Sequence, residues 1–156
     1  MKRNQSRKKH KDTKHKKVMK KQKILIVEDE TIIAVRLKNL IQRLGPYECV
    51  TVSSGEYAVE LSRTFDPHLI LMDINLNGQI NGIEAAKQIR SSNDVPVVFI
   101  SAYNDEETMK EAGQASPAGY LTKPFYARAV EKIVTSLLDK EIQFSANYEV
   151  QNTRIK

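Results

Sequence analysis

The sequence predicts an α/β fold, a three-layer, doubly wound sandwich in which helices cover both faces of a five-stranded parallel sheet. Five short apolar runs alternate with stretches that repeat apolar residues at helical spacing. Right-handed crossovers between parallel strands then place helices on both faces. A length of 156 residues suits one domain of ordinary size. We therefore expect the carboxyl ends of the strands to meet at one edge, where such sheets bind ligands.

The first half of the predicted domain contains three strands, at 23–28, 47–52 and 68–72. The helix after the first strand stops at Gly45-Pro46, and the helix after the second stops at Asp66-Pro67. Small or apolar residues recur at helical spacing in both helices: Ile33, Leu37, Leu40, Ile41 and Leu44 in the first, and Ala58, Val59, Leu61 and Ser62 in the second.

The second half adds two strands, at 95–100 and 119–121, and three helices, at 82–90, 105–114 and 125–139. A polar loop at 74–81 precedes the first of these helices. Pro96 falls at the start of its strand, where a missing amide matters least. The helix at 105–114 is short and weakly apolar.

Basic charge is concentrated at the start of the chain. Residues 1–23 carry twelve Lys or Arg and one acid, and the rest carries thirteen basic and eighteen acidic residues, so the net charge of +6 divides into +11 and −5. Because residues 1–22 contain almost no apolar side chains, we predict a disordered leader. The domain is predicted to span 23–140, and 141–156 to be a polar extension that continues the last helix and frays.

Three interpretations of the leader remain open. It could be a solvated segment without a role, or translation could begin at Met19 rather than Met1, because MKKQKILIVEDE starts there. It could also bind nucleic acid or another polyanion. Without interleaved aromatic residues or a recognition helix, such binding would be nonspecific and salt-sensitive. We favour the first two interpretations.

Several classes of protein are disfavoured. No apolar run approaches the roughly 18 residues that a membrane-spanning helix needs, and the N-terminus lacks the apolar segment of a secretory signal. We therefore predict a cytoplasmic protein that does not enter a membrane. The single cysteine, Cys49, falls in the second predicted strand. A buried thiol is favoured there over a reactive or metal-binding one.

Polar residues follow four of the predicted strands: Glu28, Asp29, Asp73, Ser101 and Lys123. Because the strands are parallel, these side chains are expected to meet at one edge of the sheet. Each has an ordinary structural alternative; Glu28 and Asp29, for example, could only cap the helix that begins near Glu30. The coincidence of five such placements favours a shared site.

Asp73 is the candidate nucleophile of this site. A carboxylate can accept a phosphoryl group if the charge of that group is neutralised and its approach is held in line. Three crowded carboxylates repel one another, and Mg²⁺, which prefers oxygen ligands, relieves the repulsion. Lys123 offers a positive charge to the phosphoryl oxygens and Ser101 a hydroxyl donor. The set predicts a Mg²⁺-dependent phosphoryl-acceptor site.

The sequence resembles the response-regulator receiver domains of two-component signalling systems over roughly 23–139. The motifs that carry the resemblance are ED at 28–29, LMDINL around residue 73, GIEAAKQIR at 82–90, SAY at 101–103 and GYLTKPF at 119–125. The resemblance implies a flavodoxin-like (βα)5 receiver fold, phosphorylation of Asp73, and Mg²⁺ held by carboxylates of Asp29 and Asp73. It further implies a metal-binding backbone carbonyl at Asn75 and a role for Glu28 through bound water.

The same resemblance implies a signalling switch rather than an enzyme. Ser101 and Tyr120 match the family's switch pair, and the Lys123-Pro124 bond is expected to be cis. A sensor histidine kinase would donate the phosphoryl group to this stand-alone, chemotaxis-regulator-like receiver, which would then act on an unknown downstream protein. A homodimer through the fourth helix, fifth strand and last helix is a further expectation.

Two departures and two rivals accompany this interpretation. The loop NLNGQING is one residue longer than usual and has Gly78 but no proline, and Glu28 replaces the more usual Asp. An aspartyl-phosphate phosphatase is one rival, but its general acid would stand two residues after the nucleophile, where this chain has Asn75. The other rival is a nucleic-acid-binding regulator that acts through the basic leader.

Overall fold

A computed structural model describes residues 20–102 and 105–152, with side chains described no further than Asp139. The predicted leader at 1–22 therefore lies outside the described residues except for its last three positions. Of the predicted extension, only the backbone of 141–152 is described. The interpretations of the leader stay predictions.

The described chain forms five strands and five helices in strict alternation. The strands are β1 Lys23–Val27, β2 Glu48–Val52, β3 Leu69–Asp73, β4 Val97–Ser101 and β5 Gly119–Thr122. The helices are α1 Thr31–Leu44, α2 Gly55–Phe65, α3 Gly82–Arg90, α4 Glu106–Gln114 and α5 Ala127–Asn152. All neighbouring strands are parallel, and the strand order is β2-β1-β3-β4-β5. The predicted fold class is confirmed.

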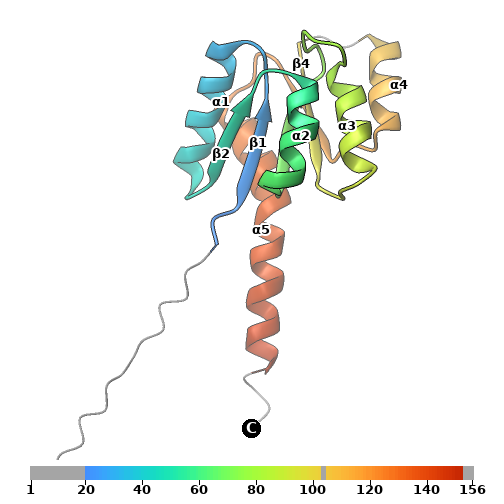
Figure 1. The fold of residues 1–156 in the computed structure, drawn as a ribbon. Coiled ribbons are helices and arrows are strands. Elements are labelled where there is room, and N and C mark those ends of the chain that lie inside the picture. The colour runs from blue at the N-terminus through green and yellow to red at the C-terminus, as the bar shows by residue number, and fades with distance from the viewer. Residues whose placement is uncertain (1–19, 103–104, 153–156) are drawn as a thin grey trace, which may run out of the picture.

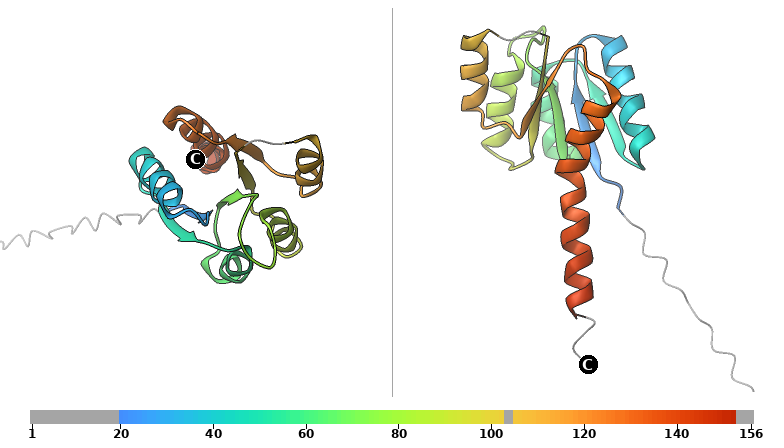
Figure 2. Two further views of the ribbon diagram at one scale, coloured as in Figure 1. Left: turned by 90° about the horizontal axis from the view of Figure 1, so that it is seen from above. Right: turned by 180° about the vertical axis from the view of Figure 1, so that it is seen from behind.

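Helices cover both faces of the sheet, with α1 and α5 on one face and α2, α3 and α4 on the other (Figures 1 and 2). Successive residues of a strand point to opposite faces. In β1, Ile24 and Ile26 therefore pack in the core under α1 and α5, while Leu25 and Val27 pack in the core under α2 and α3. All four are fully buried. This two-sided burial explains why the strand reads as a continuous apolar run.

The helix ends follow the predicted signals. Helix α1 ends just before Gly45, and α2 ends before Asp66, which adopts a left-handed conformation with φ 52°. Helix α3 begins with a capping box between Asn81 and Glu84. Its first residue, Gly82, lies so close to the sheet that a Cβ atom there would stand 1.9 Å from the carbonyl oxygen of Asp73.

The predicted bounds of three elements differ from the observed ones, by one or two residues in the two strands. Strand β3 includes Asp73, which pairs with Ile100, and excludes His68. Strand β4 begins at Val97, after Pro96, and Val95 is buried but lies outside the strand. Helix α5 begins at Ala127, two residues after the predicted start, and runs to Asn152, so it extends beyond residue 139 into the segment that was predicted to continue it.

The extra length of α5 has a simple cause in the sequence. Residues 140–152 contain neither Gly nor Pro, so nothing in the sequence stops the helix there. The helix leaves the body of the fold at the edge opposite the carboxyl ends of the strands (Figure 1). The predicted continuation of the last helix is thus present in the backbone as far as Asn152.

Two smaller expectations concern Cys49 and membranes. Cys49 is buried in β2, and burial raises the pKa of its thiol to about 11. None of the helices in the described ranges has the length and apolar character needed to span a bilayer.

Candidate functional site

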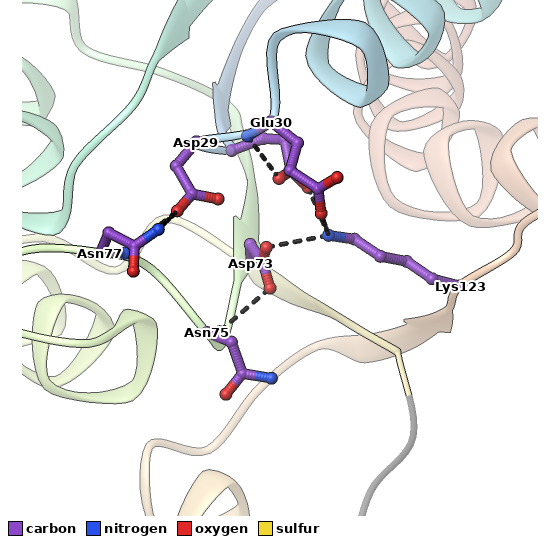
Figure 3. Close-up of polar contacts among 7 residues, drawn as sticks. Asp29, Glu30, Asp73, Asn75, Asn77 and Lys123 are labelled. Carbon is purple, nitrogen blue, oxygen red and sulfur yellow. Dashed lines mark hydrogen bonds and ion pairs between the residues drawn. The ribbon is translucent and has the colours of Figure 1, made fainter.

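The carboxyl ends of the strands bring the predicted site residues to one edge of the sheet. Figure 3 shows three of them, Asp29, Asp73 and Lys123. Glu28 and Asp29 follow β1, Asp73 ends β3, Ser101 ends β4 and Lys123 follows β5. Neighbouring strands in parallel register bring these positions to the same height, since Val27 pairs with Met72 and Asp73 with Ile100. The local sequence thus places polar side chains where the apolar strands stop.

Lys123 lies at the centre of the acidic cluster. Its Nζ is 2.7 Å from Glu28 Oε2 and 2.9 Å from Asp73 Oδ2, and 3.9 Å from Glu30 Oε1. The Lys123 side chain is only 13% exposed, and that of Glu28 is fully buried. Burial by itself would lower the pKa of Lys123, but the two close carboxylates outweigh it and raise that pKa. The ammonium group is therefore held charged between the acids.

Glu28 has two different environments at its two oxygens. Oε1 accepts a hydrogen bond from the backbone N–H of Glu30 at 3.0 Å. Glu30 is the N-cap residue of α1, and among the described residues no side chain caps the first turn of that helix, so the capping alternative is not realised. Oε2 is buried and makes no hydrogen bond of good geometry among the described residues, although it forms the ion pair with Lys123. Burial raises the pKa of the Glu28 carboxyl, and contact with Lys123 offsets part of this effect.

The carboxylates are close enough to share one cation. Glu28, Asp29 and Asp73 each offer an oxygen, and these three oxygens lie within 4.8 Å of one another. An all-oxygen donor set suits Mg²⁺, and Glu28 Oε2 has unused capacity as an acceptor. The residues present therefore fit a divalent cation. Asn75, the predicted carbonyl ligand, donates its backbone N–H to Asp73 Oδ1 at 3.0 Å.

Sequence reasoning missed two residues that shape this edge. Asn77 donates from its backbone N and from its side-chain Nδ2 to Asp29 Oδ2, at 3.2 and 2.5 Å. Glu56, at the start of α2, accepts hydrogen bonds from the backbone N–H groups of Gln79 and Ile80. The polarity of the loop was visible in the sequence, but contacts across 48 and 23 positions were not.

The hydrogen bonds that Glu56 accepts also affect the pKa of its carboxyl group. Its own backbone N–H and that of Gln79 lower the pKa of the Glu56 carboxyl. Gly78 makes room for this carboxylate, because a Cβ at Gly78 would stand 2.9 Å from Glu56 Oε2. Helix α2 therefore fixes the far half of the loop that follows Asp73.

The predicted switch residues lie on β4, which is next to β3, and on β5, the edge strand beyond β4. Ser101 is buried at the end of β4, and its carbonyl accepts the backbone N–H of Lys123 at 2.7 Å. Tyr120, on β5, is 37% exposed. Its ring lies 6.1 Å from that of Phe99, centroid to centroid. The Lys123-Pro124 peptide bond is cis, as the resemblance implied.

Comparison with known proteins agrees with this geometry. The sequence profile of the response regulator receiver domain matches residues 24–135. The alkaline phosphatase synthesis transcriptional regulatory protein PhoP of Bacillus subtilis is 34% identical over 136 residues, which cover 86% of this chain and 55% of that protein. The transcriptional regulatory protein PdtaR of Mycobacterium tuberculosis is 35% identical over 104 residues, covering 66% of this chain and 50% of that protein. The chain thus spans about half the length of the curated relatives it matches.

Solved structures show the same likeness. The signal receiver domain of a modulated diguanylate cyclase from Desulfovibrio desulfuricans G20 has a TM-score of 0.72 and 30% identity, covering 80% of this chain and 98% of that one. The receiver domain of a sensor histidine kinase from Pseudomonas aeruginosa PAO1, solved with a magnesium ion in its active-site cleft, has a TM-score of 0.69 and 27% identity, covering 76% and 98%. Sequence motifs, fold and profile agree, and the chain belongs to the response-regulator receiver family.

Proposed function

We propose that Asp73 is the phosphoryl acceptor of this receiver domain. One observation carries the proposal: the Asp73 carboxylate lies buried at the end of β3, 2.9 Å from the ammonium of Lys123 and within 4.8 Å of oxygens of Glu28 and Asp29. A carboxylate held beside a fixed cation can act as a nucleophile without a general base. The surrounding charges are those that phosphoryl transfer requires.

Each neighbour has a distinct part in the proposal. The N–P bond of a phosphohistidine breaks as an O–P bond to Asp73 forms, and the bonding electrons remain on the imidazole nitrogen. Lys123, now paired with Asp73, would turn to the incoming phosphoryl oxygens, and the Ser101 hydroxyl would donate to one of them. The Asn75 N–H keeps the Asp73 carboxylate oriented. Tyr120 would respond through β4 and β5.

A divalent cation completes the charge balance. Glu28, Asp29 and Asp73 would hold Mg²⁺, with the Asn75 carbonyl as a further ligand, and the ion would neutralise charge on the transferred group. Glu28 contributes negative charge at a buried position, in keeping with a role through bound water.

The rival functions have less support. An aspartyl-phosphate phosphatase would need an acid at position 75, and Asn75 has no proton of suitable pKa to give. Membership of the receiver family also favours the switch over an enzyme. A nucleic-acid-binding role would depend on residues 1–19, which lie outside the described residues. A sensor histidine kinase as donor, a cytoplasmic location, a downstream protein partner and a homodimer through α4, β5 and α5 remain parts of this proposal.

Intact-mass spectrometry tests the acceptor assignment. With Mg²⁺ and acetyl phosphate, wild type should gain the mass of one phosphoryl group, which hydroxylamine should remove as expected for an acyl phosphate. Asp73→Asn should gain none. Asp94→Asn is the matched control, because Asp94 is exposed and lies before β4, at the other edge of the sheet. Equal labelling of Asp73→Asn and wild type would contradict the proposal.

A further inference from the structure

We propose that Asn77 is a positioning residue for Mg²⁺, which acts by orienting the carboxylate of Asp29. The inference rests on the proposed function, because it concerns the cation of the same site. Asn77 gives Asp29 Oδ2 two donors at once, the backbone N–H at 3.2 Å and the side-chain amide at 2.5 Å. Both bonds end on the same oxygen, so the carboxylate cannot rotate without breaking them.

The orientation that results is the one a cation needs. Figure 3 shows Asn77 on one side of the Asp29 carboxylate and the other carboxylate oxygen pointing toward Asp73. A carboxylate that binds Mg²⁺ commonly gives it a single oxygen. Hydrogen bonds to the second oxygen then fix the ligand without competing for the metal. Asn77 donors are uncharged, so they leave the negative charge of Asp29 available to the cation.

The loop that carries Asn77 is itself anchored from α2. Glu56 accepts the backbone N–H groups of Gln79 and Ile80, the latter at 3.1 Å. Gly78, between Asn77 and these two residues, lets the Glu56 carboxylate approach the backbone closely. The chain of contacts therefore runs from α2 through the loop to Asp29. Glu56 contributes by holding Asn77 in place.

Calorimetric titration with Mg²⁺ alone, without a phosphoryl donor, tests the role of Asn77. Asn77→Ala removes the side-chain donor and keeps the backbone N–H, and the Kd for Mg²⁺ should rise roughly 10-fold, the lower end of the usual effect of losing an outer-shell partner. Gln79→Ala is the matched control. It shortens another amide side chain of the same exposed loop, for which the described part of the chain shows only a backbone contact.

A double-mutant cycle tests the link to Glu56. Glu56→Ala should also raise the Kd, and Asn77→Ala should add little in its presence if Glu56 acts through Asn77. Glu60→Ala, an exposed acid on the same helix, is the control and should leave the Kd unchanged. Thermal unfolding without Mg²⁺ should show all variants folded. If Asn77→Ala does not fold, the two variants of α2 still test the inference. A Kd for Mg²⁺ that is the same in Glu56→Ala as in the control Glu60→Ala would then overturn it.

The remaining outcomes separate this inference from the proposed function. An unchanged Kd in Asn77→Ala would overturn the positioning role and leave the acceptor site intact. A lower Kd would show that Asn77 competes with the cation, which is the opposite of the proposal. Wild type that binds no Mg²⁺ would overturn the metal site itself, and with it both proposals.

Discussion

Helices α3 and α4 have the same length and follow neighbouring strands, yet they are held very differently. Each begins with a side-chain cap: Asn81 accepts the N–H of Glu84 at 2.9 Å, and Asp105 accepts the N–H of Thr108 at 2.7 Å. Helix α3 buries Gly82, Ile83, Ala85, Ala86 and Ile89, whereas α4 buries Ala112 alone among its residues. Local capping is therefore similar, and packing on the sheet is not.

Because of this difference, the site has a tightly packed side, at α3, and a loosely packed side, at α4. Helix α3 starts against the backbone of Asp73, so the proposed acceptor lies on the tightly packed part. Helix α4 lies beyond Ser101 and has little buried apolar surface to hold it. Elements with few buried contacts open at lower free energy. A phosphoryl signal at Asp73 should thus move α4 more readily than α3.

The largest expected effect comes from adding one methyl group to each helix. In α3, Gly82→Ala places a Cβ 1.9 Å from the Asp73 carbonyl oxygen, and the backbone shift should lower the free energy of unfolding by about 3 kcal/mol. In α4, Gly113 has no atom within 4 Å of the corresponding position, so Gly113→Ala should raise that free energy by about 1 kcal/mol. Urea denaturation of both variants measures this. If the two substitutions changed the free energy of unfolding in the same direction, the proposed difference in packing between α3 and α4 would be contradicted.

The second prediction concerns Ser101, which ends β4 and is proposed to link the acceptor to α4. On the proposed mechanism, Ser101→Ala still accepts a phosphoryl group but loses a hydrogen bond to it, which costs the active state about 1 to 3 kcal/mol. Amide chemical shifts should then change less on phosphorylation in α4 and around Tyr120 than they do in wild type. Shifts in α3 should be small in both proteins. An undiminished response of α4 in the variant would contradict the coupling.

Removal of the caps is the third way to compare the helices. Asn81→Ala should lower the global free energy of unfolding by about 1 kcal/mol, because α3 unfolds only with the core. Asp105→Ala removes a similar cap from α4, but its effect should appear as faster amide hydrogen exchange within α4. Exchange in α3 should stay unchanged in that variant. If Asp105→Ala destabilised the whole protein as much as Asn81→Ala, then α4 would be part of the cooperative core.

The smallest expected effect is a dependence of α4 on pH. The N–H of Thr108 lowers the pKa of Asp105 below its ordinary value of 3.8. A carboxyl with a depressed pKa in the folded state stabilises above its unfolded pKa, and this is lost as the pH falls through the folded value. Amide protection in α4 should therefore decrease as the pH falls below about 4. Asp105→Asn, which cannot titrate, should show a flatter profile.

The sequence predicted most of the fold for identifiable reasons. Strands buried on both faces read as continuous apolar runs, and Gly45-Pro46 and Asp66-Pro67 stop helices in any context. Helix α3 was predicted with its observed bounds from the helical spacing of Ile83, Ala86 and Ile89. The weakly apolar character of α4 was visible in the sequence, but its loose packing on the sheet was found only in the structure. The residue at which α5 ends could not be predicted, because no residue in that segment signals the end of a helix.

The candidate site was predictable where the topology alone brings residues together. Asp73 and Lys123 meet because β3 and β5 flank β4 and end at one edge. The contacts of Asn77 with Asp29 and of Glu56 with the loop depend on loop conformation instead. No periodicity or spacing in the sequence fixes a loop, so these residues could only be found in the structure.

The burial of Cys49 makes it practical to label α3 and α4 separately with probes attached to introduced cysteines. It is the single cysteine of the chain, it is 7% exposed, and its thiol has a pKa of about 11. At neutral pH only about one molecule in ten thousand carries the thiolate that reacts with a maleimide. We therefore expect Cys49 in the native protein to react very slowly with such reagents. A cysteine introduced on the surface of either helix can be given a spin label or fluorophore without first removing Cys49 from the core.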